Sequence, residues 1–318
     1  MSKIRVAILG YGNLGKALEK ELLKTPNVEL VGIFSRRPNI KSNLLSPVYS
    51  RNKLINCKKK IDILAISSGS KTDVTIDAPL FSRLFNTINT FDTHALIPRE
   101  YENLNQICKE CGTISIMSAG WDPGLFSQTR AMFYSILETN PICFWGKGTS
   151  LGHSDAVKRV AGVLDAIAFT VPERNAITLS NQGLIPPEPR HTREVYALVK
   201  DDADKNKISH QIKTMDNYFS GQPTTVTFVT VDELNKMKNF SHAGQIIAVK
   251  LADNNVFKLK LETEMSSNPQ MTAMIVASYI KAFPKIKVKY PAGAYTPLHF
   301  SPLDLVCLND IDAIKKFC

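Results

Sequence analysis

Short apolar runs, each ending in glycine, serine or aspartate, recur through the first third of the chain. They read IRVAILG, VELVGIFS, IDILAISSG, NTINTFD and TISIMSAG. Between several of them, at 14–24, 76–85 and 98–111, apolar residues return at the three- and four-residue spacing of helices. Strands alternating with helices predict an α/β fold, a Rossmann-type doubly wound parallel sheet.

Beyond Asp122 the pattern changes, because apolar strands follow one another with fewer helices between them. The strands read AIAFTV, REVYALVK, TTVTFVT, QIIAVKL and VFKLKLETE, and helices are expected at 124–138, 154–163, 270–283 and 301–316. This part predicts an α+β domain on an open, largely antiparallel sheet. We therefore expect one domain over 1–122, completed by the C-terminal segment 290–318, and a second domain over 123–289.

Composition narrows the class of protein. The chain has 318 residues, 44% of them hydrophobic, which is enough to bury the cores of two domains. No apolar run approaches the roughly 20 residues of a membrane-spanning helix, and the N-terminus begins a strand instead of a signal peptide. A cytoplasmic protein without a membrane partner is expected.

The cysteines and the net charge give weaker evidence about function. The six cysteines are scattered, and the C-x-x-C pair Cys108 and Cys111 has no second pair or suitably spaced histidines, so free thiols and no metal site are expected. The net charge of +10 comes from lysines spread along the chain and not interleaved with aromatics, which argues against nucleic-acid binding. Such a field would attract small polyanions such as a phosphorylated cofactor.

The first βα turn carries a glycine pattern with a chemical meaning. Its sequence GYGNLG comprises Gly10, Tyr11, Gly12, Asn13, Leu14 and Gly15 and matches G-x-G-x-x-G. Missing side chains allow a tight turn and close approach to a pyrophosphate, which the N-terminus of the following helix attracts. A glycine turn can also be purely structural, but the strand before it and the helix after it favour dinucleotide binding by the first domain.

The end of the second strand indicates which dinucleotide is bound. Ser35, Arg36 and Arg37 stand where an NAD-binding domain usually places a carboxylate. Guanidiniums can donate paired hydrogen bonds to a 2′-phosphate, so NADP is the expected cofactor, the alternative being a solvated basic turn. The expected cofactor contacts after the third strand are Ser67, Ser68, Gly69 and Ser70.

Several longer motifs together carry a family resemblance over nearly the whole chain. The motifs GYGNLG, VGIFSRR, DTHALIPRE, SAGWDPGLFS, FWGKG, GHSDAVKR and SSNPQMTA make the chain similar to the meso-diaminopimelate dehydrogenase family. The resemblance implies NADP-dependent, reversible oxidative deamination of the D-centre of meso-2,6-diaminopimelate to L-2-amino-6-oxopimelate and ammonia, in the lysine and diaminopimelate pathway. It also implies a homodimer.

The substrate has a carboxylate and an amine at each end, so the site needs both cations and acceptors. Asp92 and Asp122 follow the fourth and fifth strands, where they could hold the reacting amine or take its proton, although by themselves they are equally well helix caps. By resemblance the other substrate contacts are Trp145, Leu151, Gly152, His153, Thr170, Arg193, His242 and Asn268. Leu151 to Asp155 are expected to form a closing turn, and His242 on its own would be structural.

Two other functions compete with this one. A different two-domain NADP-dependent reductase, of the dihydrodipicolinate or semialdehyde type, would act on a substrate that lacks one ammonium group. A non-catalytic NADP-binding sensor would use Asp92 and Asp122 only as caps and Arg193 only as a surface charge.

Overall fold

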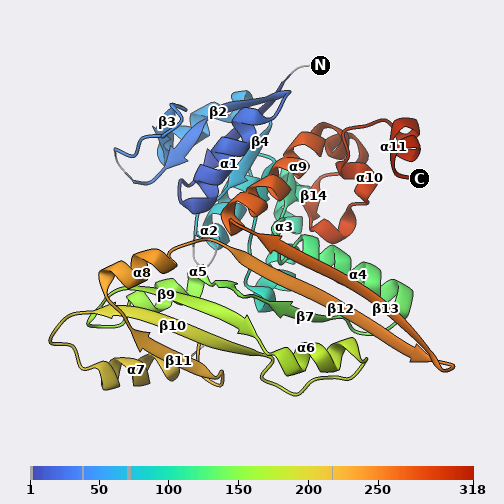
Figure 1. Ribbon diagram of the computed structural model, residues 1–318. Coiled ribbons are helices and arrows are strands. Elements are labelled where there is room, and N and C mark those ends of the chain that lie inside the picture. Colours follow the sequence, from blue (N-terminus) through green and yellow to red (C-terminus); the bar gives the residue numbers. More distant parts are fainter. Residues whose placement is uncertain (1–2, 38, 70–72, 217) are drawn as a thin grey trace. The chain divides into compact units, whose positions relative to one another are not determined.

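The structure, a computed structural model, describes residues 3–37, 39–69, 73–216 and 218–318 (Figure 1). The chain divides into two compact units. The first comprises residues 1–128 and 269–318, and the second comprises residues 129–268. Among the described residues, no helix is long and apolar enough to cross a membrane.

The first unit is built on a seven-stranded parallel sheet with the order β14-β6-β5-β4-β1-β2-β3. Its strands are β1 (Ile4–Leu9), β2 (Val28–Ser35), β3 (Val48–Ser50), β4 (Ile63–Ile66), β5 (Thr87–Asn89), β6 (Ile114–Ile116) and β14 (Gly293–Tyr295). The chain leaves β1 toward β2 on one side and reaches β4 on the other. The switch in direction at β1 is where such sheets bind ligands, beyond the carboxyl ends of the strands.

Helices cover both faces of this sheet. They are α1 (Asn13–Lys24), α2 (Val74–Ser82), α3 (Ile97–Cys111) and α9 (Asn268–Lys289). The unit also contains α10 (Pro302–Leu305), α11 (Asp310–Phe317) and 3-10 turns at Arg51–Lys60, His94–Leu96 and Pro297–His299. Alternate residues of β1 enter different cores: Val6 and Ile8 pack with α1 and α9, whereas Ala7 and Leu9 pack with α2 and α3.

The compact units differ from the expected domains at two segments, residues 123–128 and residues 269–289, which both lie in the first unit. The larger of the two contains α9, which lies in the first unit and not in the second because Val276, Ile280, Phe283 and Ile286 are buried in the core of the first unit. The helix continues through Pro284 to Lys289.

The helix expected at 301–316 is wrong in its continuity. Two helices replace it, because Ser301 caps α10 and Asn309 caps α11, each accepting a hydrogen bond from a backbone N–H three residues later. Between them Val306 is extended. Local capping therefore divides a segment whose apolar spacing alone is continuous.

The second unit contains two sheets instead of the one expected. The four-stranded sheet has the order β11-β10-β9-β8, with β8 (Gly148–Thr149), β9 (Val163–Pro172), β10 (His191–Val199) and β11 (Thr224–Phe228); β10 and β11 are parallel and the other pairs antiparallel. The three-stranded antiparallel sheet has the order β13-β12-β7, with β7 (Ile142–Trp145), β12 (His242–Ala252) and β13 (Asn255–Met265).

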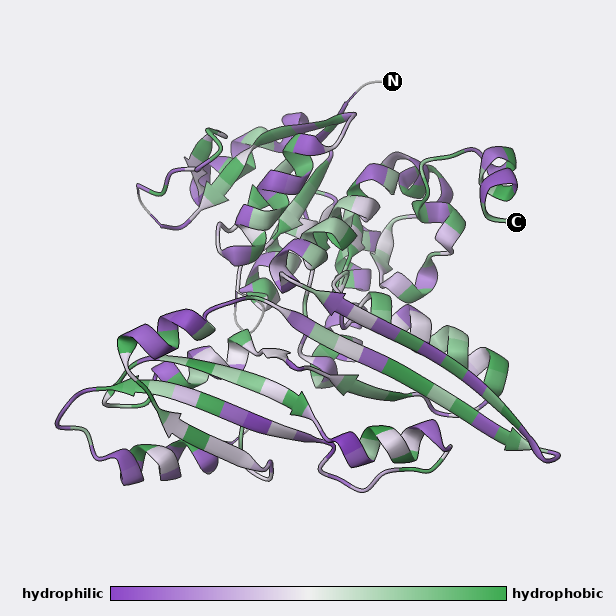
Figure 2. Cartoon of the chain, viewed as in Figure 1, coloured by the Kyte–Doolittle hydropathy of each residue, from purple (hydrophilic) through white to green (hydrophobic). Residues whose placement is uncertain are grey.

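Helices of the second unit include several that the apolar pattern did not reveal. They are α5 (Leu151–Lys158), α6 (Arg174–Asn181), α7 (Lys205–Lys213) and α8 (Val231–Met237), and α4 (Leu125–Leu137) crosses the boundary between the units. The helix expected at 154–163 is wrong in position, because Val163 already begins β9. Polar and apolar residues alternate along β13 (Figure 2).

Candidate functional site

The glycine turn after β1 is shaped by backbone geometry. Gly10 has a φ of +98°, which L side chains rarely adopt, and a Cβ there would lie 2.7 Å from the Ser68 nitrogen. A Cβ on Gly15 would overlap the Gly10 carbonyl oxygen. These two glycines therefore bring α1 close to the strand ends of the sheet.

Gly12 is different, because the protein itself does not require glycine there. Its φ of −89° and ψ of −156° are open to other residues, and no protein atom lies within 4 Å of the place a Cβ would occupy. It is the N-cap of α1, whose first N–H groups have no partner within the helix. The open space at this helix end suits a phosphate, so the turn fits a dinucleotide.

The two arginines after β2 lie beside this turn. The Arg37 guanidinium donates to the carbonyl oxygen of Tyr11, and its backbone N–H donates to the Ser35 hydroxyl at 3.1 Å. Arg36 pairs with Asp73 and keeps 58% of its side chain exposed. Arg37 is thus held at the glycine turn and Arg36 at the start of α2, and both carry donors that suit a 2′-phosphate.

A buried carboxylate fastens the same turn to α1. Glu19, only 1% exposed, accepts hydrogen bonds from the Tyr11 hydroxyl at 2.5 Å and from the Ser42 hydroxyl. Burial and this contact raise the pKa of Tyr11. Tyr11 therefore supports the loop through its side chain.

The described residues after β4 contact both the glycine turn and α2. Ser67 donates to the Gly10 carbonyl oxygen at 2.9 Å, and Ser68 donates at 2.9 Å to the buried Asp77, which also pairs with Arg51 at 2.5 Å. The Gly69 carbonyl accepts from the first turn of α2. Ser70, also expected at the cofactor, lies outside the described residues.

The segment GWDPG after β6 forms a tight turn that positions Asp122. Gly124 has a φ of +139°, and a Cβ there would overlap the Gly120 carbonyl oxygen. The Gly120 N–H donates to the Pro123 carbonyl at 3.0 Å, and Trp121 packs on Phe126 with ring centroids 4.6 Å apart. Asp122 is therefore held on a closed turn.

Asp92 lies beyond the neighbouring strand β5. The two strand ends are tied by Asn89, whose amide oxygen accepts from Phe91 N–H at 3.0 Å and from Ser118 N–H at 3.4 Å. Asp92 is exposed, whereas Asp122 is half-buried. The structure thus places both aspartates at the carboxyl edge of adjacent strands.

The second unit brings Thr170 and Arg193 together. They are directly paired residues of β9 and β10, and the Arg193 guanidinium donates to the Thr170 hydroxyl. Burial lowers the pKa of Arg193, and its buried Nε has no hydrogen-bond partner among the described residues. A guanidinium with a spare buried donor is suited to a carboxylate.

His242 lies near this pair, beside the strand that is paired with Thr170. Gly148 is paired with Thr170, and a Cβ on Gly148 would lie 2.6 Å from the His242 ring. His242 Nδ1 donates to the Ala243 carbonyl at 2.8 Å, and burial lowers the pKa of the ring. The Asn268 N–H donates to the carbonyl of residue 240 at 2.8 Å.

The expected closing turn is instead the first turn of α5. Leu151, Gly152 and His153 begin this helix, and no protein atom lies within 4 Å of a Cβ placed on Gly152. His153 Nδ1 accepts from the Ser150 hydroxyl at 2.7 Å and Nε2 donates to the Tyr218 carbonyl at 2.9 Å. Both ring nitrogens are therefore engaged, and burial, with the charge of Arg193, lowers the pKa of His153 to about 4.

Trp145 has a neighbour that sequence reasoning missed. The backbone N–H of Trp145 donates to His191 Nε2 at 2.9 Å, and the centroids of the two rings lie 5.3 Å apart. His191 stands two residues before Arg193, on the same face of β10. The two-residue spacing from Arg193 was the sequence signal that His191 lies near the candidate site, since nothing in the sequence indicates what His191 contacts.

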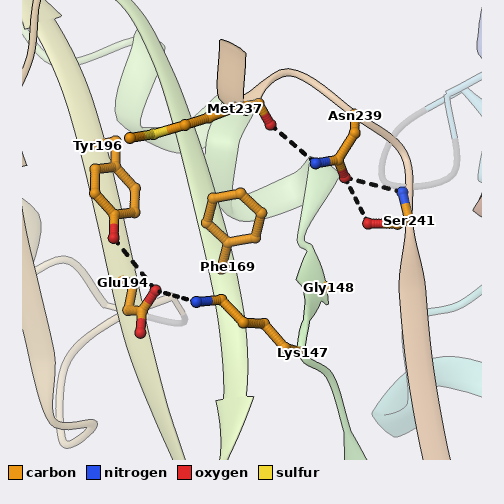
Figure 3. Close-up of a pocket in the computed structure, with 8 residues that line it drawn as sticks. All are labelled: Lys147, Gly148, Phe169, Glu194, Tyr196, Met237, Asn239 and Ser241. Carbon is orange, nitrogen blue, oxygen red and sulfur yellow. Dashed lines mark hydrogen bonds and ion pairs between the residues drawn. The ribbon is translucent and has the colours of Figure 1, made fainter. Parts of the chain in front are cut away.

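The opposite face of the same sheet carries a separate pocket of about 490 Å³ (Figure 3). Phe169 and Tyr196 form apolar walls, and Lys147 pairs with Glu194 at 3.0 Å. Phe169 and Glu194, which line the pocket, are next to Thr170 and Arg193 along β9 and β10, and neighbouring side chains of a strand point to opposite faces. The pocket therefore does not belong to the cluster of Thr170 and Arg193. Among the described residues, no group of three or more histidines, cysteines or acids could hold a metal ion.

Comparison with known proteins decides the family. A family model described as "Diaminopimelic acid dehydrogenase C-terminal domain" matches residues 120–266. The chain is 37% identical over 326 residues to the meso-diaminopimelate D-dehydrogenase of Ureibacillus thermosphaericus, with 99% of both chains covered. The chain belongs to the meso-diaminopimelate D-dehydrogenase family. The Corynebacterium glutamicum member is 34% identical, again over 99% of both chains.

Solved structures extend the family relationship to the fold. The C. glutamicum DAP dehydrogenase in complex with DAP is 32% identical and superposes with a TM-score of 0.94, covering all of both chains. An engineered D-amino acid dehydrogenase bound to NADP+ is 31% identical and has a TM-score of 0.90 over the same coverage. The Rossmann-type first domain and the second α+β domain expected from the sequence are confirmed.

Proposed function

We propose that this family member catalyses the NADP-dependent, reversible oxidative deamination of meso-2,6-diaminopimelate at its D-centre. The products are L-2-amino-6-oxopimelate, which cyclises to tetrahydrodipicolinate, and ammonia. The observation that carries the proposal is the pairing of Thr170 with a half-buried Arg193 whose Nε is fully buried, in a chain that matches a family member over 99% of both chains and shares the family's fold. This pair suits the carboxylate of the substrate's L-centre.

The first unit has the features that NADP binding needs. The open space at Gly12 and the free helix end of α1 would hold the pyrophosphate, while Arg36 and Arg37 would hold the 2′-phosphate. NADP, when bound, supplies the acceptor for the hydride that leaves the D-centre. Arg36 would exchange its contact with Asp73 for the phosphate.

The acid-base chemistry is assigned to the aspartates at the edge of the same sheet. Asp122, held on its glycine turn, would accept the proton that the D-centre ammonium must lose before its carbon can be oxidised. Asp92 would hold the same nitrogen. Water then adds to the substrate imine, and ammonia leaves.

Stereoselectivity is assigned to the second unit. Arg193 and Thr170 would bind the distal carboxylate, His242 and Asn268 would contact the same L-centre, and Trp145 would form a wall of the substrate site. Leu151, Gly152 and His153 at the start of α5 would contact the substrate, mainly through Leu151 and the backbone because both His153 nitrogens are engaged. Fixing the L-centre leaves the D-centre as the reacting end.

We also propose that the chain is a homodimer joined through β13. This strand is an edge of its sheet, and its outer row of charges reads Lys258, Lys260, Glu262 and Glu264. Antiparallel pairing of two copies about Leu261 would place each lysine opposite a glutamate. A cytoplasmic location is proposed on the six free thiols.

The decisive experiment measures NADPH formation with NADP and the meso, L,L and D,D isomers of diaminopimelate, repeated with NAD. Turnover with NADP and the meso isomer alone is expected. Absence of turnover with every isomer, in protein that binds NADPH, would refute the proposed reaction and favour the sensor. Equal turnover of substrates lacking the second amino-acid centre would favour another reductase.

A further inference from the structure

His191 makes a contact that links the two sheets of the second unit. It begins β10 of the four-stranded sheet, and Trp145 ends β7 of the three-stranded sheet. β7 is an edge strand, and the outward N–H of Trp145 donates to His191 Nε2 at 2.9 Å. A side chain thereby satisfies a backbone donor that the sheet leaves without a strand partner.

The rings reinforce this contact. His191 is 8% exposed, and its ring lies 5.3 Å from the Trp145 ring and 5.9 Å from the Phe144 ring. The indole is therefore held by its own backbone and by ring packing on the same partner. Arg193 follows two residues later on the same strand face, so one short segment supports Trp145 and carries the guanidinium.

The contact requires a neutral imidazole, because Nε2 must offer its lone pair. Two features keep the ring neutral: burial, and the positive charges of Arg193 and Arg190, which together lower the pKa of His191 to about 4. The hydrogen bond also assigns the remaining proton to Nδ1.

We propose that His191 is a positioning residue for the dehydrogenase reaction, which fixes Trp145 at a set distance from the Arg193 clamp and so determines how tightly the diamino diacid is held. This inference rests on the proposed function. His191 acts through Trp145 and is assigned no contact with the substrate.

The test compares His191→Phe, which keeps a ring but loses the acceptor, with His191→Gln, which offers an oxygen acceptor. His210→Phe, at an exposed position of α7, is the matched control. Steady-state kinetics with NADP and meso-diaminopimelate should show KM for the amino acid raised about tenfold or more in His191→Phe, the loss of about one hydrogen bond. KM for NADP should stay within about twofold, and His191→Gln should recover most of the effect.

A second measurement does not depend on turnover. In a Trp121→Phe background Trp145 is the one tryptophan, since the chain has two. Its emission should move to longer wavelength in His191→Phe and return in His191→Gln.

The outcomes separate the two proposals. Unchanged KM for the amino acid and unchanged Trp145 emission in His191→Phe would overturn the positioning role. If KM for the amino acid rises equally in His191→Phe and His191→Gln, and KM for NADP and the melting temperature change equally in both, His191 has only a structural role. That result would also overturn the positioning role. If the parent enzyme does not turn over diaminopimelate, the proposed function fails, while the emission still decides whether His191 holds Trp145.

Discussion

Mild acid should destabilise the second unit through its neutral histidines. The pKa of His153 and of His191 is lowered from 6.5 to about 4. Because the folded value lies below the unfolded one, the unfolded chain binds the proton first. Stability is therefore fully present above pH 6.5 and declines as the pH falls toward 4.

The magnitude follows from the size of the shift. At 1.36 kcal/mol per pKa unit, each histidine removes about 3 kcal/mol from the free energy of unfolding by pH 4, and about 2 kcal/mol by pH 5. For a protein of this size, 2 kcal/mol corresponds to a fall of about 5 °C in the melting temperature.

Thermal unfolding followed by circular dichroism at pH 7.5 and pH 5 measures the effect. The His191→Gln variant should lose about 5 °C less than the parent between the two pH values, since glutamine does not titrate. The exposed His210→Gln should behave like the parent. If parent and His191→Gln fall in parallel, the neutral, buried state assigned to His191 is wrong.

Three further predictions concern the cofactor site and assembly. Gly12→Ala should weaken NADP binding about tenfold or more in calorimetry, while the melting temperature changes little, because the added methyl meets only the ligand space; unchanged affinity would show that no phosphate approaches there. The double variant Arg36→Ala with Arg37→Ala should lower kcat/KM with NADP about a hundredfold and leave NAD turnover nearly unchanged, and an equal loss with both would contradict the 2′-phosphate assignment. Reversing both glutamates of the β13 charge row to lysine should give monomers in sedimentation, and reversing both lysines as well should restore the dimer; dimers in the first variant would place the interface elsewhere.

The first unit was largely predictable because its signals are local. The glycine turn and the basic residues after β2 are read within a few positions of the strands that carry them. The segment 36–60 was not predicted, because its short strand and 3-10 turn depend on partners far along the chain, such as Asp77 for Arg51.

The second unit was harder to predict from the sequence, because its structure depends on capping and on contacts between distant segments. α8 is seven residues long and is defined by a capping box between Thr230 and Glu233, which apolar spacing does not detect. His191 becomes informative only when β7 is brought beside β10. The substrate contacts carried over from the family stay predictions, and they rest on motifs that hydrophobic periodicity does not detect.

The three-stranded sheet has two edge strands, β7 and β13, and they differ in how readily a further strand could add to them. At β7 the outward Trp145 N–H is already taken by His191, whereas β13 has strand β12 on one side only. An open edge is a template to which further strands can add. If the proposed dimer forms through β13, the charge row, which is complementary to itself about a two-fold axis, would pair this edge with an identical edge, and such a pair would close at two chains instead of extending as a fibre.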